Sequence, residues 1–424
     1  MSATTTTLAS VLKEFYLGPI REQIAQEANV LSMFKKATVS WQGKRAVVPL
    51  HVSRNSGVGA IAESGTLPTA GNQGYAQLDI TAKFVYGRFQ VSGPAIASSK
   101  SSAGAFATYV GSELDKLVED MANLENQLAV HGGKVLGFVW QKQAAATAWE
   151  YAGRVSTTGL PLQVGNATDT VDFIRLDTYA AVATNRQVTA ITESQLTLSG
   201  GTPATTNGAG EPAGTVFAIV ASANSTIIGG VANQFNNEPS GITSNLADPT
   251  AFGTDRTDAT GTPALQSNFL LIDPVNDVYA ALDLKRMQAA LDTLAEQGVD
   301  ADVILTHPSM RAEYTDLLVG VNAANLYVDT DKKGKGGDAG FAGGLGYNGK
   351  PMVISRHAHK GTFYFLRTKD WSFCELEAGG FMDKDGAMLS RVPNTDAYEG
   401  TWRHYYEVAC TRPSAQCVLT GISF

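Results

Sequence analysis

The sequence predicts an α+β protein in which long strands, one long helix and a compact α/β unit follow one another along the chain. Apolar and polar residues alternate over 77–86, as in a half-buried strand. Apolar residues recur at three- and four-residue steps over 102–130, which is typical of an amphipathic helix. Stretches rich in Thr, Ser and Gly within 140–235 predict a small inserted β-rich domain.

The composition favours a protein with much surface buried against other protein. The chain has 424 residues, enough for two or three domains at about 150 residues each. Charged residues make up 17%, against about 25% in an average globular protein, while 44% of residues are apolar. The net charge of −8 argues against tight binding of DNA, because that affinity comes from basic side chains that neutralise phosphates.

Cysteine usage and hydropathy limit the compartment. The three cysteines, Cys374, Cys410 and Cys417, are an odd number and predict free buried thiols in a reducing cytoplasm. The chain starts without a basic segment followed by an apolar one, so no secretory signal is expected. No run approaches the roughly 20 apolar residues that span a membrane, and no membrane association is expected.

The N-terminal third predicts an arm, a β extension and a helix. Residues 1–44 form the arm, with amphipathic helical pieces over 8–37. Residues 45–97 form two strands around a polar, glycine-punctuated loop, with Gly87 permitting a bulge or bend. One face of the second strand is expected to carry Leu78, Ile80, Ala82, Phe84 and Tyr86. Residues 98–139 contain the long helix, about 40 Å in length.

The remainder predicts an insertion, a linker and an α/β unit. The inserted β-rich domain covers 140–235, and a linker rich in Asn, Pro, Gly and Thr covers 236–269. In the α/β unit at 270–361, a helix is expected to start at an Asp273 cap and to stop at Gly298. The unit continues with a strand at 303–305 and a helix at 308–318. Residues 362–424 supply closing strands.

A phosphate-binding loop is one candidate site. The segment from Gly344 to Lys350 satisfies G-x-x-x-x-G-K, the pattern whose backbone cradles phosphates. The next residue is Pro351 rather than the Ser or Thr that binds Mg²⁺, and the loop opens a strand rather than a helix. A nucleotide-binding enzyme that uses this loop therefore stays an unfavoured alternative.

Other candidate chemistry is sparse. His357 and His359 could offer two metal ligands, but a zinc site needs three or four, and a solvated turn is the preferred interpretation. Cys410 and Cys417 flank Pro413, which suggests a hairpin across which they could meet. The sequence contains no catalytic constellation, so neither an enzyme activity nor a metal or cofactor is expected.

The order of elements resembles the major capsid proteins of tailed bacteriophages, the Hong Kong 97-like fold. Residues 43–96 resemble the extended E-loop of that family, and 106–128 (FATYVGSELDKLVEDMANLENQL) resemble the spine helix of its P-domain. Residues 278–314 look like the helix-strand-helix of its A-domain. The stretch GYNGKPMVIS resembles the turn of the family into a central strand, which accounts for the apparent phosphate loop.

The resemblance implies a shell protein. Such subunits assemble into pentamers and hexamers of an icosahedral capsid that encloses packaged double-stranded DNA, in the cytoplasm of the host bacterium. The chain starts directly at the arm, without the scaffolding segment of some relatives, so the resemblance implies a separate scaffolding protein and a portal. It leaves room for a decoration protein. No lysine lies in the loop at 51–75, so an isopeptide cross-link at the loop tip is not expected.

Two charged residues are candidates for contacts between subunits. Arg54 and Glu63 both lie in the predicted E-loop, where an ion pair to a neighbouring chain would hold the arm in place. An encapsulin-like nanocompartment shell is the nearest alternative, although such shells are typically shorter. A surface adhesin is a third possibility, suggested by the β-rich stretch but disfavoured by the long helix.

Overall fold

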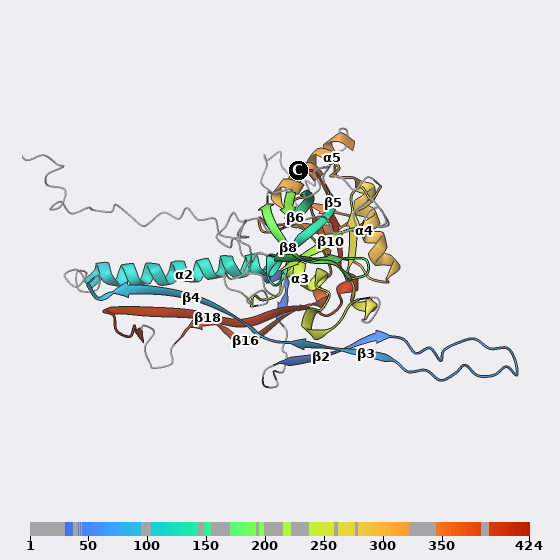
Figure 1. Ribbon diagram of the computed structural model, residues 1–424, viewed down its shortest axis with the longest axis horizontal. Coiled ribbons are helices and arrows are strands. Elements are labelled where there is room, and N and C mark those ends of the chain that lie inside the picture. The colour runs from blue at the N-terminus through green and yellow to red at the C-terminus, as the bar shows by residue number, and fades with distance from the viewer. Residues whose placement is uncertain are drawn as a thin grey trace, which may run out of the picture.

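The computed structural model places a compact body between two projections (Figure 1). One projection consists of helix α2 with the long strands β4, β18 and β16 beside it, and the other is the β2–β3 arm. The structure describes residues 30–36, 41, 43, 45–94, 103–142, 148–153, 170–191, 195–198, 215–221, 237–257, 262–275, 279–321, 345–382 and 390–424. Most of the N-terminal helical pieces expected over 8–37 lie outside these residues.

Helix α2 (Ala103–His131) packs on a five-stranded sheet. The sheet runs in the order β1 (Lys35–Lys36), β16 (Trp371–Phe381), β18 (Ala397–Cys410) and β17 (Ser390–Arg391), with β4 (Lys83–Ser92) also paired to β18. Strands β4 and β18 are antiparallel and stay in register over ten residue pairs, from Lys83 opposite Tyr406 to Ser92 opposite Ala397. The helix expected from the sequence is confirmed.

The strand expected over 77–86 is broken in the structure. Strand β3 (Gly74–Ile80) ends before Thr81, and β4 then joins a different sheet. The buried face changes with it: Leu78 and Ile80 are buried, but Phe84 and Tyr86 are 57% and 52% exposed, and Val85 and Gly87 point inward instead. The prediction of one continuous apolar face was therefore wrong for Phe84 and Tyr86.

Gly87 has a packing role rather than the bulge expected from the sequence. It pairs with Trp402 of β18 without any shift of register. A Cβ at Gly87 would lie 2.7 Å from the Sδ of Met121 and 3.0 Å from a methyl of Leu117. The glycine thus allows α2 to approach β4 closely.

The arm is a two-stranded antiparallel ribbon that extends away from the body (Figure 1). Strand β2 (Ala46–Ser53) pairs with β3, from Ala46 opposite Ile80 to Ser53 opposite Gly74. Its base is anchored by Leu78 and Ile80, which are buried with Cys374 and Ala409 of the five-stranded sheet. The residues between the two strands form the extended tip.

The inserted β-rich region is a closed barrel with the strand order β10-β5-β6-β9-β8-β7. Its core contains Trp149, Phe173 and Phe217, with ring centroids 5.3 and 6.3 Å from Trp149. The barrel begins at Val135, inside the segment expected to belong to the helix unit. Its strands are β5 (Val135–Lys142), β6 (Ala148–Gly153), β7 (Thr170–Arg175), β8 (Ala181–Ile191), β9 (Gln195–Leu198) and β10 (Phe217–Ala221).

Within the segment at 236–269, the described residues 237–257 pack into the body and do not form the linker expected from the composition. Helix α3 (Ile242–Ala247) is buried along its whole length. The Asn245 amide donates to the backbone oxygens of Ser240, Gly241 and Val408, and its oxygen accepts from the amide of Cys410. Short polar residues therefore serve as hydrogen-bonding partners of the sheet backbone rather than as flexible connectors.

The α/β unit is a six-stranded mixed sheet with two helices. Helix α4 starts at Leu284 rather than near Asp273, because Asp283 is the residue whose side chain caps it, accepting from the amide of Lys285 at 3.0 Å. Met287, Leu291 and Leu294 bury its inner face. The elements are β11 (Asn268–Leu271), β19 (Cys417–Thr420), β15 (Phe363–Leu366), β12 (Val303–Thr306), β14 (Lys350–Ile354) and β13 (Gly346–Tyr347) in sheet order, with α4 (Leu284–Glu296) and α5 (Pro308–Val321).

The N-terminal segment enters the body over α2. The amides of Val30 and Leu31 both donate to the Asn126 side-chain oxygen, at 2.8 and 3.2 Å. Residues Leu31–Met33 form a single 3₁₀ turn and Phe34 is extended, so the helical pieces expected over 8–37 do not extend through these residues. Phe34 then stacks on Trp371 of β16, with centroids 5.1 Å apart.

Candidate functional site

The tip of the arm leaves large apolar side chains in water. Val58, Ile61 and Leu67 are 84%, 47% and 77% exposed. Backbone contacts order the segment, because the amide of Gly65 donates to Ala62 oxygen at 2.9 Å. Exposed apolar side chains that lie close together often mark a site of contact with another protein. The tip therefore has the properties of a contact surface.

The two charged candidates lie at different places on the arm. Arg54 directly follows β2, at the end of the ribbon where the tip begins, and lines a cavity of about 430 Å³ with His51, Leu265 and Arg412. Glu63 lies in the exposed tip, nine positions further along. The structure does not bring the two together, and among the described residues neither forms an ion pair.

A second exposed surface lies on the five-stranded sheet. Phe84 packs edge-on against Tyr405 with centroids 4.9 Å apart, and the hydroxyl groups of Tyr86 and Tyr405 are 3.1 Å apart. Tyr405 lies opposite Phe84 in the β4–β18 register, so the three rings share one face of the sheet. Inward residues of the same strands, such as Val85, are buried. The outward face therefore presents aromatic rings to solvent.

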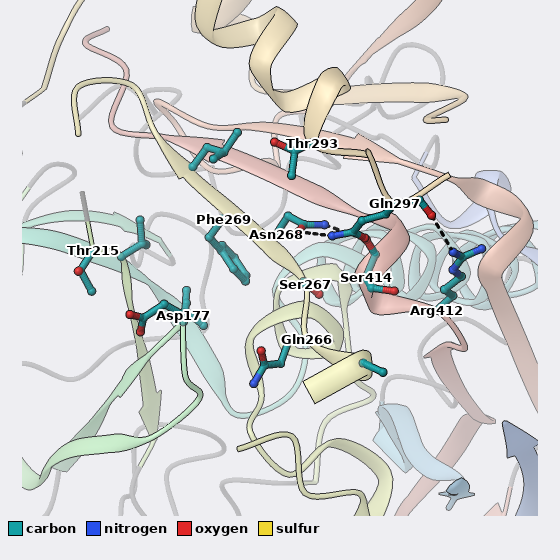
Figure 2. Close-up of a pocket in the computed structure, with 14 residues that line it drawn as sticks. Asp177, Thr215, Gln266, Ser267, Asn268, Phe269, Thr293, Gln297, Arg412 and Ser414 are labelled. Atoms are coloured by element: carbon teal, nitrogen blue, oxygen red, sulfur yellow. Dashed lines mark hydrogen bonds between the residues drawn. The ribbon is translucent and has the colours of Figure 1, made fainter. Parts of the chain in front are cut away.

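A groove lies between the barrel, β11 and α4 (Figure 2). Its volume is about 700 Å³, within the range of ligand sites. Asn268 donates to the backbone oxygens of Ser414 and Gln416, and Gln297 donates to Asn268 at 2.8 Å. Asp177 is ion-paired with Arg175. The described lining residues offer amide donors and acceptors, but no nucleophile with an adjacent base.

The apparent phosphate loop is a β-hairpin in the part of the chain that the structure describes. Asn348 and Gly349 have φ of 49° and 75°, which is typical of the two-residue turn that joins β13 to β14. Lys350 forms an ion pair with Asp300. Gly344 lies outside the described residues. A strand that follows the loop and an engaged lysine do not suit a phosphate cradle.

The histidine pair is buried, so the interpretation as a solvated turn was wrong. His357 and His359 are 5% and 1% exposed. The ring of His359 bonds to His131 of α2 at 2.8 Å and to the Tyr364 hydroxyl at 2.7 Å. Within the described residues, no group of three His, Cys, Asp or Glu could hold a metal ion.

The cysteines are free and buried, as expected from their number. Burial raises the pKa of each thiol to about 12, with smaller effects from their neighbours. The hairpin expected between Cys410 and Cys417 does not occur, because β18 and β19 belong to different sheets.

His404 and Glu407 are buried ionisable residues that no sequence motif singled out. They lie on β18 and are 7% and 1% exposed. His404 contacts carboxylates of Glu125 on α2 and Glu375 on β16, at 2.7 and 3.0 Å. The inward alternation of Trp402, His404 and Tyr406 was a usable signal for the histidine. No local pattern marks Glu407, which lies where β18 becomes buried on both sides.

The chain was compared with protein families, curated proteins and solved structures. No family model matches the sequence, and no curated protein matches it. A chain of the cyanophage A-1(L) capsid asymmetric unit matches with a TM-score of 0.58 and 14% identity, over 100% of both chains. This chain has the fold of a phage capsid protein. The expected α+β capsid-type fold is therefore confirmed.

Two further solved structures match this chain more weakly. The capsid of an empty GTA particle matches with a TM-score of 0.49 and 9% identity, over 99% of both chains. A chain of Mycobacterium phage Ogopogo matches with a TM-score of 0.45 and 8% identity, also over 99% of both. Among the described helices, none combines the length and hydropathy that a membrane span needs.

Proposed function

We propose that this protein is the major capsid protein of a tailed bacteriophage and that its role is structural rather than enzymatic. The observation that carries the proposal is the full-length likeness to the cyanophage A-1(L) capsid chain. The projecting arm supports it, because exposed Val58 and Leu67 gain stability only when a partner covers them. The groove residues, whose amides are engaged with one another, supply no competing catalytic arrangement.

The elements correspond to Hong Kong 97-like subdomains in this proposal. The β2–β3 arm serves as the E-loop, and α2 with β4, β16 and β18 forms the P-domain with its spine helix. The six-stranded sheet with α4 and α5 forms the A-domain. The barrel is an insertion domain, whose strands lie in the body at one end of α2 (Figure 1).

The proposed assembly is an icosahedral shell of pentamers and hexamers that encloses double-stranded DNA. Specific interfaces bury on the order of 800 Å² per partner, which a projecting arm supplies without a large body contact. A net charge of −8 disfavours adhesion to DNA, which must move during packaging. A separate scaffolding protein, a portal and a decoration protein are the partners proposed for assembly in the host cytoplasm and for the virion.

Electron microscopy tests the proposal directly. The purified chain is imaged after expression alone and after expression with its neighbouring genes. Closed shells tens of nanometres across, or rings of five and six subunits, support a capsid function. A uniform monomer or dimer under both conditions contradicts it. Binding of a nucleotide to the purified chain would instead favour the alternative at Lys350.

A further inference from the structure

His404 lies between two carboxylates that come from different elements. Its Nδ1 is 2.7 Å from an oxygen of Glu125 on α2, and its Nε2 is 3.0 Å from an oxygen of Glu375 on β16. A neutral imidazole has one N–H, so it donates to one carboxylate and turns a lone pair toward the other. A protonated imidazole donates to both.

The buried surroundings of His404 make the difference in stability between its neutral and protonated forms large. The side chains of His404 and Glu125 are 8% and 9% exposed. The rings of Phe373, Trp402 and Tyr406 lie 4.6 to 5.8 Å from the imidazole centroid and exclude water. In such an environment charge-assisted hydrogen bonds are strong, and a carboxylate that faces a lone pair is costly.

We propose that His404 is a proton-operated clamp that holds helix α2 against the five-stranded sheet. With its proton, the ring joins α2, β18 and β16 through two charge-assisted bonds. Without it, one carboxylate loses its donor, and the attachment of α2 weakens at that point. The clamp lies within one chain, so it stands or fails independently of the proposed capsid function.

Neighbouring charged groups have their own interactions. On β18, Arg403 forms an ion pair with Glu377 of β16. From β4, the charge of Lys83 acts on Glu407. Burial raises the pKa of Tyr406, and the negative charges of Glu125, Glu407 and Glu238 raise it further. Of these groups, Arg403, Glu377, Lys83, Tyr406 and Glu238 stay unchanged in the variants used below, and Glu407 is treated separately.

The direction of the pH effect follows from linkage. Burial lowers the pKa of His404, but the hydrogen bonds and charges of Glu125 and Glu375 outweigh it, so the pKa lies above its ordinary value of 6.5. A group whose pKa is raised on folding contributes stability that is fully present below the unfolded value. That stability is lost as the pH rises through the folded value. Helix α2 should therefore be held more firmly in mildly acidic than in alkaline solution.

Hydrogen–deuterium exchange of the full chain tests the clamp. Exchange of the α2 segment at 117–131 is measured at ~pH 5.5 and ~pH 8.5, between which histidine titrates, after correction for intrinsic rates. We expect opening of this segment to rise about tenfold across the range, because one hydrogen bond to a charged group contributes on this order to stability. E125Q should flatten this rise, because an amide pairs with the ring in either protonation state. H51Q, at an exposed histidine on the arm, should leave it unchanged.

Glu407 titrates in an overlapping range, so the measurement is repeated in E407Q. The proposal is overturned if E407Q with E125Q keeps the pH response of E407Q alone. A variant that fails to fold is replaced by a direct measurement on the unaltered chain. Selective ¹³C labelling of the six histidines lets NMR follow the His404 ring. A pKa above 6.5 supports the clamp, and one below 6.5 excludes it.

Discussion

Gly87 of β4 and Met121 of α2 lie so close that a Cβ on the glycine would be 2.7 Å from the Sδ of the methionine. Carbon and sulfur atoms do not approach this closely in contact, so any side chain at Gly87 displaces the helix or its side chains. The position of α2 on the sheet thus depends on a residue that has no side chain. From the sequence, the same glycine was expected to permit a bulge or bend.

We expect G87A to destabilise the folded chain by about 1–3 kcal/mol, the usual cost of overpacking. In an open strand position the same change is neutral or favourable, because alanine loses less backbone entropy. G380A is the matched control, since a Cβ at Gly380 of β16 meets nothing within 4 Å. Urea unfolding of the unassembled chain measures both. Equal midpoints for the two variants contradict the packing role, and recovery in G87A with M121A supports it.

Glu407 predicts a pH dependence of stability. Burial raises the pKa of this carboxyl from 4.5 to about 7, although its bond from the amide of Ser240 and the charge of Lys83 oppose the shift. The folded state thus binds more protons than the unfolded state between these values, so stability falls as the pH rises through this range. The loss is roughly 2–4 kcal/mol at about 1.4 kcal/mol per pKa unit.

E407Q should remove most of this dependence, because glutamine resembles the protonated carboxyl. Above pH ~7 the variant should be the more stable form. E399Q is the control, because Glu399 on the same strand forms a half-exposed pair with Arg88 and should change stability by less than about 1 kcal/mol. Thermal unfolding across the pH range distinguishes them. A parallel profile for E407Q and the unaltered chain refutes the assignment.

Elements that depend on local periodicity could be predicted from the sequence. The apolar positions of α2, such as Leu117, Met121 and Leu128, recur at helical spacing whatever they contact. The strands around Val188 and Leu196 likewise alternate within themselves. These patterns predicted a long helix and an inserted β-rich region, both of which the structure contains.

Features that depend on tertiary partners could not be predicted in this way. Phe84 continues the alternation of Ile80, yet β4 turns its other face inward, because it joins β18 instead of β2. The polar composition around Asn245 resembles that of a linker. The segment is buried because its polar side chains bond to backbone oxygens such as that of Val408, and the sequence does not show these partners. The partners of His404 are 29 and 279 positions away in sequence, so no local pattern contains them.

The three cysteines should be inert in the folded protein. Burial raises the pKa of Cys374, Cys410 and Cys417 to about 12, so thiolate is scarce at neutral pH and reagents have no access. We expect a thiol reagent to modify none of them in the native chain within minutes and all three in denaturant. Mass spectrometry counts the adducts. Rapid modification of any one in the native chain disproves its burial.

Arg54 and Glu63 are expected to contribute to contacts between subunits through charge. Charge reversal of both, R54E with E63K, should reduce the yield of shells. The free energy of unfolding should change by less than about 0.5 kcal/mol, because both side chains are exposed in the single chain. Arg88, exposed on β4, provides the control variant R88E. Light scattering and electron microscopy measure assembly. Normal shells from the reversed chain exclude a role for these two charges.

The apolar tip should matter more than its charges. Val58 and Leu67 are 84% and 77% exposed in the single chain, so changing both to aspartate costs the folded subunit little. If a neighbouring subunit covers them, the same change buries unpaired carboxylates in the interface and should abolish assembly. V275D is the matched control, because Val275 is 76% exposed on the body. Sedimentation separates shells from subunits. Shells from the tip variant in normal yield would show that these side chains stay in water, and the arm would then lack the role proposed for it.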